Sequence, residues 1–135
     1  MQYFPIENSR LNEIVLQLYL GEWHSSVRKA TLLVGANEAT QFVIELSKNA
    51  GWRERVAAAT IICAFDLHEF IAPLVHTFAS NPENYTAEAF SRLLSSSTMS
   101  DKDALLSEMQ KACPTTSYGN HLLEVIEKAS AHESK

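Results

Sequence analysis

The hydrophobic positions of this chain recur with helical spacing, and they are densest between residues 52 and 79. Residues 56–65 are almost all apolar, and a helix that is apolar nearly all round packs on more than one side. Residues 67–78 place their apolar side chains at i, i+3, i+4 and i+7, which is one face of a helix. We therefore predict a buried helix and an amphipathic helix that meet at Asp66.

The same periodicity predicts further helices along the rest of the chain. No stretch alternates with the period of two that a half-buried strand requires. The additional helices are expected at residues 8–20, 23–35, 37–50, 86–94, 100–112 and 118–131. Together these patterns predict an all-α fold of about eight helices.

Residues with short, oxygen-bearing side chains stand near several predicted helix starts. Such side chains accept hydrogen bonds from the first backbone N–H groups of a helix. The expected caps are Asn8 or Ser9, Asn37, Asp66 with Glu69, Thr86, and Ser100 with Asp103. Gly51 is expected to end the third helix, and Pro73 is expected inside the fifth, where a proline costs about 3 kcal/mol unless the helix kinks.

Two segments of the chain resemble each other at an offset of 29 residues, which aligns Trp23 with Trp52 and residues 30–34 with residues 59–63. The aromatic position recurs at Tyr85 and Tyr118, so four predicted helices begin alike. Periods of this length are typical of stacked helix pairs that complete one another's core. We expect the tryptophans to pack between repeats, and exposed stacking anchors are the alternative.

The repeat resembles the HEAT-repeat signature, in which one helix carries a V-R-x-A-A type motif and the next an I-x-P-L-L type motif. Residues 27–30 (VRKA) match the first motif, and residues 71–75 (IAPLV) match the second. Residues 56–59 (VAAA) depart from the pattern because the arginines stand at positions 53 and 55. The resemblance covers residues 23–95 and implies a short α-solenoid, although an irregular helical bundle would have similar periodicities.

We expect a single helical domain over residues 1–135. Within it, residues 8–20 would form an N-terminal cap helix, and residues 23–79 two clear repeat pairs. Residues 85–131 would form weaker repeats and a C-terminal cap.

The net charge of −5 falls entirely in residues 66–110, which carry seven acids against two bases. An acidic surface repels nucleic acid and attracts basic partners. The candidate partner-binding residues are therefore Asp66, Glu69, Glu83, Glu88, Asp101, Asp103 and Glu108. The alternative interpretation is that these acids favour helix starts and solvated helix faces.

The sequence contains no recognisable catalytic signature. It has neither a phosphate-binding glycine loop nor a zinc motif, and no histidine forms an i, i+4 pair with another histidine or a cysteine. The five histidines are His24, His68, His76, His121 and His132. We therefore predict no metal, no cofactor and no enzymatic activity. A pocket lined by His68, His76 or Cys113 would favour a small enzyme instead.

The compartment is predicted from the cysteines and from the apolar runs. Cys63 and Cys113 form no disulfide framework, which is usual in a reducing cytosol. The first ten residues lack the basic and apolar regions of a signal peptide, and no apolar run has the roughly 20 residues of a membrane helix. We expect a cytoplasmic protein.

A small, acidic, helical protein of this kind is similar to the immunity proteins that bacteria make beside secreted nuclease toxins, including those of contact-dependent growth inhibition. The resemblance implies tight binding of a basic, RNA-cleaving toxin domain, EndoU-like or RNase-like, whose active site is occluded. It also implies a monomer or weak dimer that contacts neither nucleic acid nor membrane. The alternatives are a HEAT-like adaptor for another cytosolic protein and a small helical enzyme.

Overall fold

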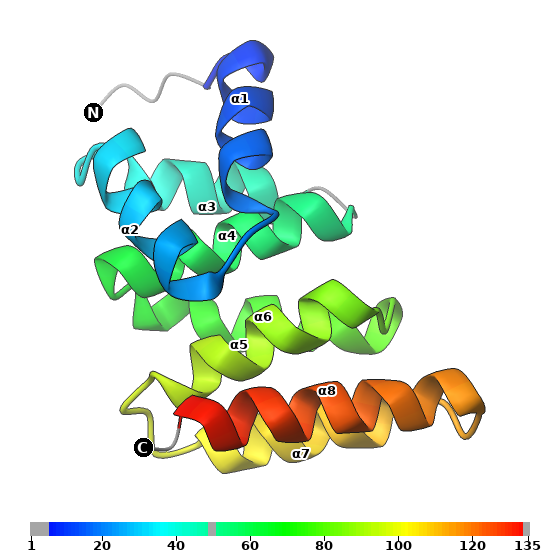
Figure 1. Cartoon of the computed structure of the whole chain (residues 1–135). Coiled ribbons are helices and arrows are strands. Elements are labelled where there is room, and N and C mark those ends of the chain that lie inside the picture. The colour runs from blue at the N-terminus through cyan, green and yellow to red at the C-terminus, as the bar shows by residue number, and fades with distance from the viewer. Residues whose placement is uncertain (1–5, 49–50, 134–135) are drawn as a thin grey trace. The chain divides into compact units, whose positions relative to one another are not determined.

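The computed structural model describes residues 6–48 and 51–133, and every regular element in these ranges is helical (Figure 1). Two short 3₁₀ turns, η1 (His68–Phe70) and η2 (Thr77–Ser80), flank one of the α-helices. The α-helices are α1 (Asn8–Leu18), α2 (Trp23–Leu33), α3 (Ala39–Ser47), α4 (Trp52–Phe65), α5 (Ile71–His76), α6 (Asn84–Ser95), α7 (Lys102–Ala112) and α8 (Ser117–Glu133). The predicted all-α fold is confirmed.

The chain divides into two compact units, residues 1–67 and residues 68–135. The boundary falls directly after Leu67 and separates α4 from α5, the two helices that the sequence pattern joined at Asp66. Each unit is described by itself below. The single domain expected over residues 1–135 stays a prediction.

The first unit is built around α4, which packs against α1, α2 and α3. The side chains of Ala57, Ala58, Ala59 and Ile61 are fully buried in α4, and the burial predicted for residues 56–65 is confirmed for residues 56–62, whereas residues 63–65 are half-buried. Three small alanines in succession allow neighbouring helices to approach closely. Other buried side chains of this core are Leu18, Ala30, Phe42, Val43 and Leu46.

The second unit consists of two helical layers, because α6 packs against α8 and α5 packs against α7. α6 and α8 are parallel (Figure 1). At their first residues the Asn84 N–H donates to the Tyr118 hydroxyl oxygen at 3.1 Å, and near their ends the Ser95 hydroxyl lies 3.5 Å from the Ser130 carbonyl oxygen. The two helices that carry the aromatic positions 85 and 118 at their starts therefore lie side by side, and their assignment to a solenoid or a bundle stays a prediction.

The predicted side-chain caps are wrong for Asn8, Ser9, Asn37, Thr86 and Ser100, because α1, α3, α6 and α7 begin after Glu7, Glu38, Glu83 and Asp101. Two helices are capped by glutamates that stand one residue before them. The Glu22 carboxylate accepts hydrogen bonds from the first N–H groups of α2, and the Glu83 carboxylate accepts them from α6. A glutamate side chain is long enough to accept hydrogen bonds from two N–H groups at once, and its negative charge interacts favourably with the positive end of the helix dipole.

The prediction that Gly51 ends the third helix is wrong. Gly51 has an extended backbone (φ −72°, ψ 144°) and directly precedes α4, while Ala50, expected on the third helix, lies outside the described residues. The break at Asp66 is confirmed. Asp66 adopts the left-handed conformation (φ 58°), and the Leu67 N–H donates to the Ile62 carbonyl at 3.0 Å, which closes α4 in the manner of a Schellman motif. The capping box of Asp66 with Glu69 stays a prediction.

Pro73 does not interrupt a long helix, because residues 68–80 form three short elements instead of one helix. Pro73 is the third residue of α5, where its missing N–H would have no partner within the helix. The proline is therefore accommodated in a first turn, and the interior cost expected from the sequence does not arise.

Candidate interaction surface

The seven candidate acids do not all belong to one unit. Asp66 lies in the first unit, whereas the other six lie in the second. The second unit contains nine acids and five bases, a net charge of −4, and the first contains seven acids and six bases, a net charge of −1. The negative charge is thus concentrated on the α5–α8 unit.

Three of the six candidate acids in the second unit interact with neighbouring residues of that unit. Glu83 caps α6, and Glu88 pairs with Arg92 one turn further along the same helix, with Oε2 3.1 Å from Nε. The Glu108 carboxylate lies 2.5 Å from Nδ1 of His76 and so joins α7 to α5. These carboxylates stabilise the unit, and they are only secondary candidates for contact with a partner.

Glu69, Asp101 and Asp103 are exposed, and no hydrogen bond or ion pair of their side chains is found among the residues that the structure describes. Asp66 is also exposed but has an interaction of its own within the molecule. These three candidate carboxylates of the second unit therefore remain hydrated and available.

The stacking of α5 on α7 brings two of these three acids to the same end of one layer. Figure 1 shows α5 and α7 running in the same direction, and the His76–Glu108 pair fixes their register. Glu69 precedes His76 by seven residues, and Asp101 precedes Glu108 by seven. Glu69 lies in η1 directly before α5, and Asp101 directly precedes α7, so both acids stand at the N-terminal ends of these two helices, with Asp103 in the first turn of α7.

The histidines show no metal-binding arrangement in the described residues, where no group of three or more His, Cys, Asp or Glu could hold an ion. His76 pairs with Glu108, and Nε2 of His121 lies 3.0 Å from Oδ1 of Asn84. His24 is exposed and His68 half-buried, and the side chain of His132 lies outside the described part.

Both cysteines are half-buried, and neither forms a disulfide. Burial raises the pKa of the Cys113 thiol above its ordinary value. The Cys113 Sγ also donates to the Met109 carbonyl at 3.4 Å. A thiol with a raised pKa forms little of the nucleophilic thiolate at neutral pH.

The aromatic residues at helix starts fall into two classes. Trp23 is buried, which fits the packing role predicted for it. Trp52 is half-buried, and its ring makes an edge contact with Tyr19 at 5.5 Å while the Arg53 guanidinium lies 4.9 Å from its centre. Tyr85 and Tyr118 are exposed. The repeat therefore conserves the place of the aromatic residue along the helix but not its burial.

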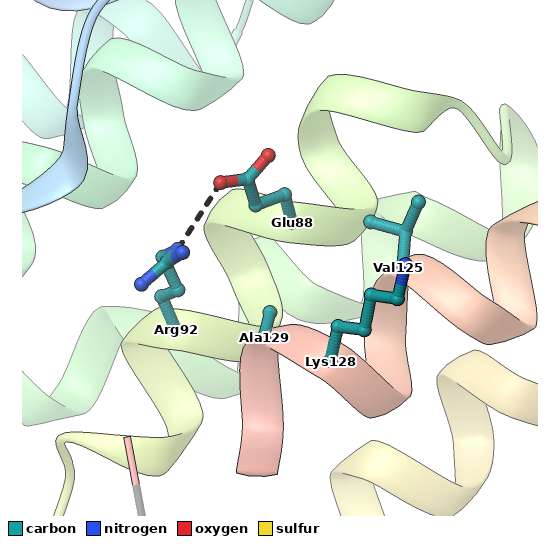
Figure 2. Close-up of a pocket in the computed structure, with 5 residues that line it drawn as sticks. All are labelled: Glu88, Arg92, Val125, Lys128 and Ala129. Atoms are coloured by element: carbon teal, nitrogen blue, oxygen red, sulfur yellow. Dashed lines mark hydrogen bonds and ion pairs between the residues drawn. The ribbon is translucent and has the colours of Figure 1, made fainter. Parts of the chain in front are cut away.

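A hollow of about 300 Å³ lies between α6 and α8 (Figure 2). It is lined by Glu88, Arg92, Val125, Lys128 and Ala129. Sequence reasoning missed it: the i, i+4 spacing of Glu88 and Arg92 indicates their ion pair, but nothing in the sequence places α8 beside them.

A second hollow of about 200 Å³ is lined by Ser95, Lys102, Asp103, Leu106 and Ser130. Asp103, which is exposed and unpaired among the described residues, therefore also borders this hollow. Neither hollow is lined by His68, His76 or Cys113, the residues on which the enzyme alternative depended.

Within the described ranges, no helix is both long enough and apolar enough to cross a membrane. Comparison of the chain with protein-family models, with curated proteins and with solved structures found no match in any of the three.

Proposed function

We propose that this protein binds a basic protein through the exposed carboxylates of Glu69, Asp101 and Asp103 on its second unit, and that it acts as an immunity protein against a secreted, RNA-cleaving toxin. One observation carries the proposal. Glu69, Asp101 and Asp103 are exposed and unpaired among the described residues, in a unit of net charge −4.

The chemistry of a nuclease makes it a suitable partner for such a surface. An enzyme that binds RNA presents lysines and arginines to the phosphates, and hydrated carboxylates attract the same groups. Complementary charge accelerates association and helps to select the partner. Carboxylates placed over the RNA-binding cleft would occlude it, and this mechanism needs no catalytic residue, metal or cofactor on the immunity protein.

The proposal is tested first by recovering the partner. The tagged protein is incubated with cytosol of its source cell at low and at moderate salt, and bound proteins are identified by mass spectrometry. We expect one stoichiometric basic protein whose RNA-cleaving activity is lost in the complex. Recovery of several unrelated proteins would favour an adaptor, and a partner without nuclease activity would overturn the toxin assignment.

The binding surface is tested with matched charge reversals. The double variant Asp101→Lys/Asp103→Lys should weaken binding of the recovered partner about tenfold or more and reduce its salt dependence, because two attractive charges become repulsive. Glu124→Lys/Glu127→Lys is the control, since it makes the same change in net charge at exposed positions of α8. Circular dichroism should show equal helicity for both. Equal weakening by the two variants would mean that only net charge matters.

A further inference from the structure

The hollow between α6 and α8 differs in charge from the rest of the acidic second unit. Two of the unit's five bases, Arg92 and Lys128, border it. Val125 and Ala129 contribute apolar surface beside them (Figure 2). Glu88 also lines the hollow, so its charged lining has a net charge of +1 beside apolar side chains, an arrangement that suits an amphiphilic anion.

The two bases differ in how far their charge is compensated. Nε of Arg92 lies 3.1 Å from the Glu88 carboxylate, and the Arg92 side chain is only 18% exposed. Arg92 is therefore fixed and neutralised. Lys128 is exposed, and among the described residues no acid forms an ion pair with it. The uncompensated charge of the hollow is thus the ammonium of Lys128.

We propose that this hollow binds a carboxylate that carries a short apolar body. The carboxylate would pair with Lys128, and the body would lie on Val125 and Ala129. A volume of about 300 Å³ is at the lower end of the range for small-molecule sites. The carboxylate has two possible sources, a free small molecule and an acidic side chain of a bound protein. The proposal does not depend on the immunity function, which rests on the α5/α7 layer.

The test is an amide NMR titration of the whole chain with sodium butyrate. Saturable shifts are expected at residues 88, 92, 125, 128 and 129. Lys128→Gln should weaken butyrate binding about fivefold, the upper range for an exposed ion pair. Lys111→Gln, which removes an exposed charge from α7, should leave the affinity unchanged. Butylammonium chloride at equal ionic strength should give no saturable shifts.

A second arm distinguishes the two sources of the carboxylate. The blocked peptide acetyl-Ala-Glu-Ala-amide should bind more tightly than butyrate if the site receives a protein side chain, and more weakly if it receives a free molecule. The proposal is overturned by the absence of saturable butyrate shifts, by equal shifts with butylammonium, or by an unchanged affinity in Lys128→Gln. Thermal unfolding of both variants verifies that the fold is retained.

Discussion

In each unit two helices that carry the repeated aromatic residue at their start pack on each other, but the burial of that residue differs. In the first unit α2 packs on α4, and Trp23 at the start of α2 is 7% exposed. In the second unit α6 packs on α8, and Tyr118 at the start of α8 is 47% exposed, with its hydroxyl accepting the Asn84 N–H. The repeat therefore marks where a helix begins, whereas burial depends on what packs against that end.

The surfaces of the two units differ as well. The first unit is nearly neutral and exposes large apolar side chains at Leu16, Leu20 and Leu32. The second unit has a net charge of −4, and two of its exposed large apolar side chains are the tyrosines at positions 85 and 118. A basic partner would thus be attracted to the second unit far more strongly than to the first.

The contrast in burial predicts unequal losses of stability at equivalent positions. Trp23→Ala should lower the free energy of unfolding by about 3–5 kcal/mol, as for other large core truncations. Tyr118→Ala should lower it by about 1 kcal/mol, since it removes one hydrogen bond and little buried area. Urea unfolding followed by circular dichroism measures both. Similar losses would show that the exposed tyrosine supports its unit as much as the buried tryptophan does.

A close backbone contact occurs in the second unit at Gly119, where a Cβ atom would lie 1.6 Å from the carbonyl oxygen of Pro114. Gly119→Ala should therefore lower the free energy of unfolding by about 3 kcal/mol, because α8 must shift away from the residues before it. At Gly35 in the first unit, a Cβ atom would lie no closer than 3.0 Å to the movable side chain of Asn37. Gly35→Ala is the control, with an expected change within about 0.5 kcal/mol. A stable Gly119→Ala variant would contradict this packing.

The helical periodicity predicted the fold well, because apolar spacing along a helix is a local property. The all-apolar run of α4 indicated its burial, and Asp66 was placed correctly as the end of that helix. The partners of the acids could not be predicted. Glu108 contacts His76 across 32 residues, a pairing that only the stacking of α5 on α7 creates. The need for a glycine at position 119 could not be predicted either. A glycine within a helix is normally destabilising, and only the nearby Pro114 carbonyl explains why it is required there.

The helix caps, like the partners of the acids, could not be predicted from local sequence alone. Short polar residues at the helix starts were the natural candidates by propensity, yet in α2 and α6 a glutamate one residue before the helix makes the bonds. Local propensity indicates that a helix begins, with an uncertainty of one or two residues. The residue that caps it depends on the backbone angles at that point, which the sequence does not specify.

The smallest expected effect concerns an ion pair of the first unit. The Arg10 guanidinium donates to both oxygens of the Glu38 carboxylate, at 2.7 and 2.5 Å, and holds the pKa of Glu38 below its ordinary value. A lowered folded-state pKa means that the pair stabilises the fold above the unfolded-state pKa of glutamate. The contribution should be lost as the pH falls through the folded-state pKa. Both side chains are partly exposed, so we expect at most about 1 kcal/mol at neutral pH.

A double-mutant cycle of Arg10→Met and Glu38→Gln isolates this contribution, because it removes the separate contact of Arg10 with the ring of Phe42 from the coupling energy. The coupling should be measurable at neutral pH and should vanish in acid, once Glu38 is protonated. A coupling that persisted unchanged at low pH would mean that the two side chains interact by packing. In that case the Arg10–Glu38 pair would not make the stability of the first unit depend on charge.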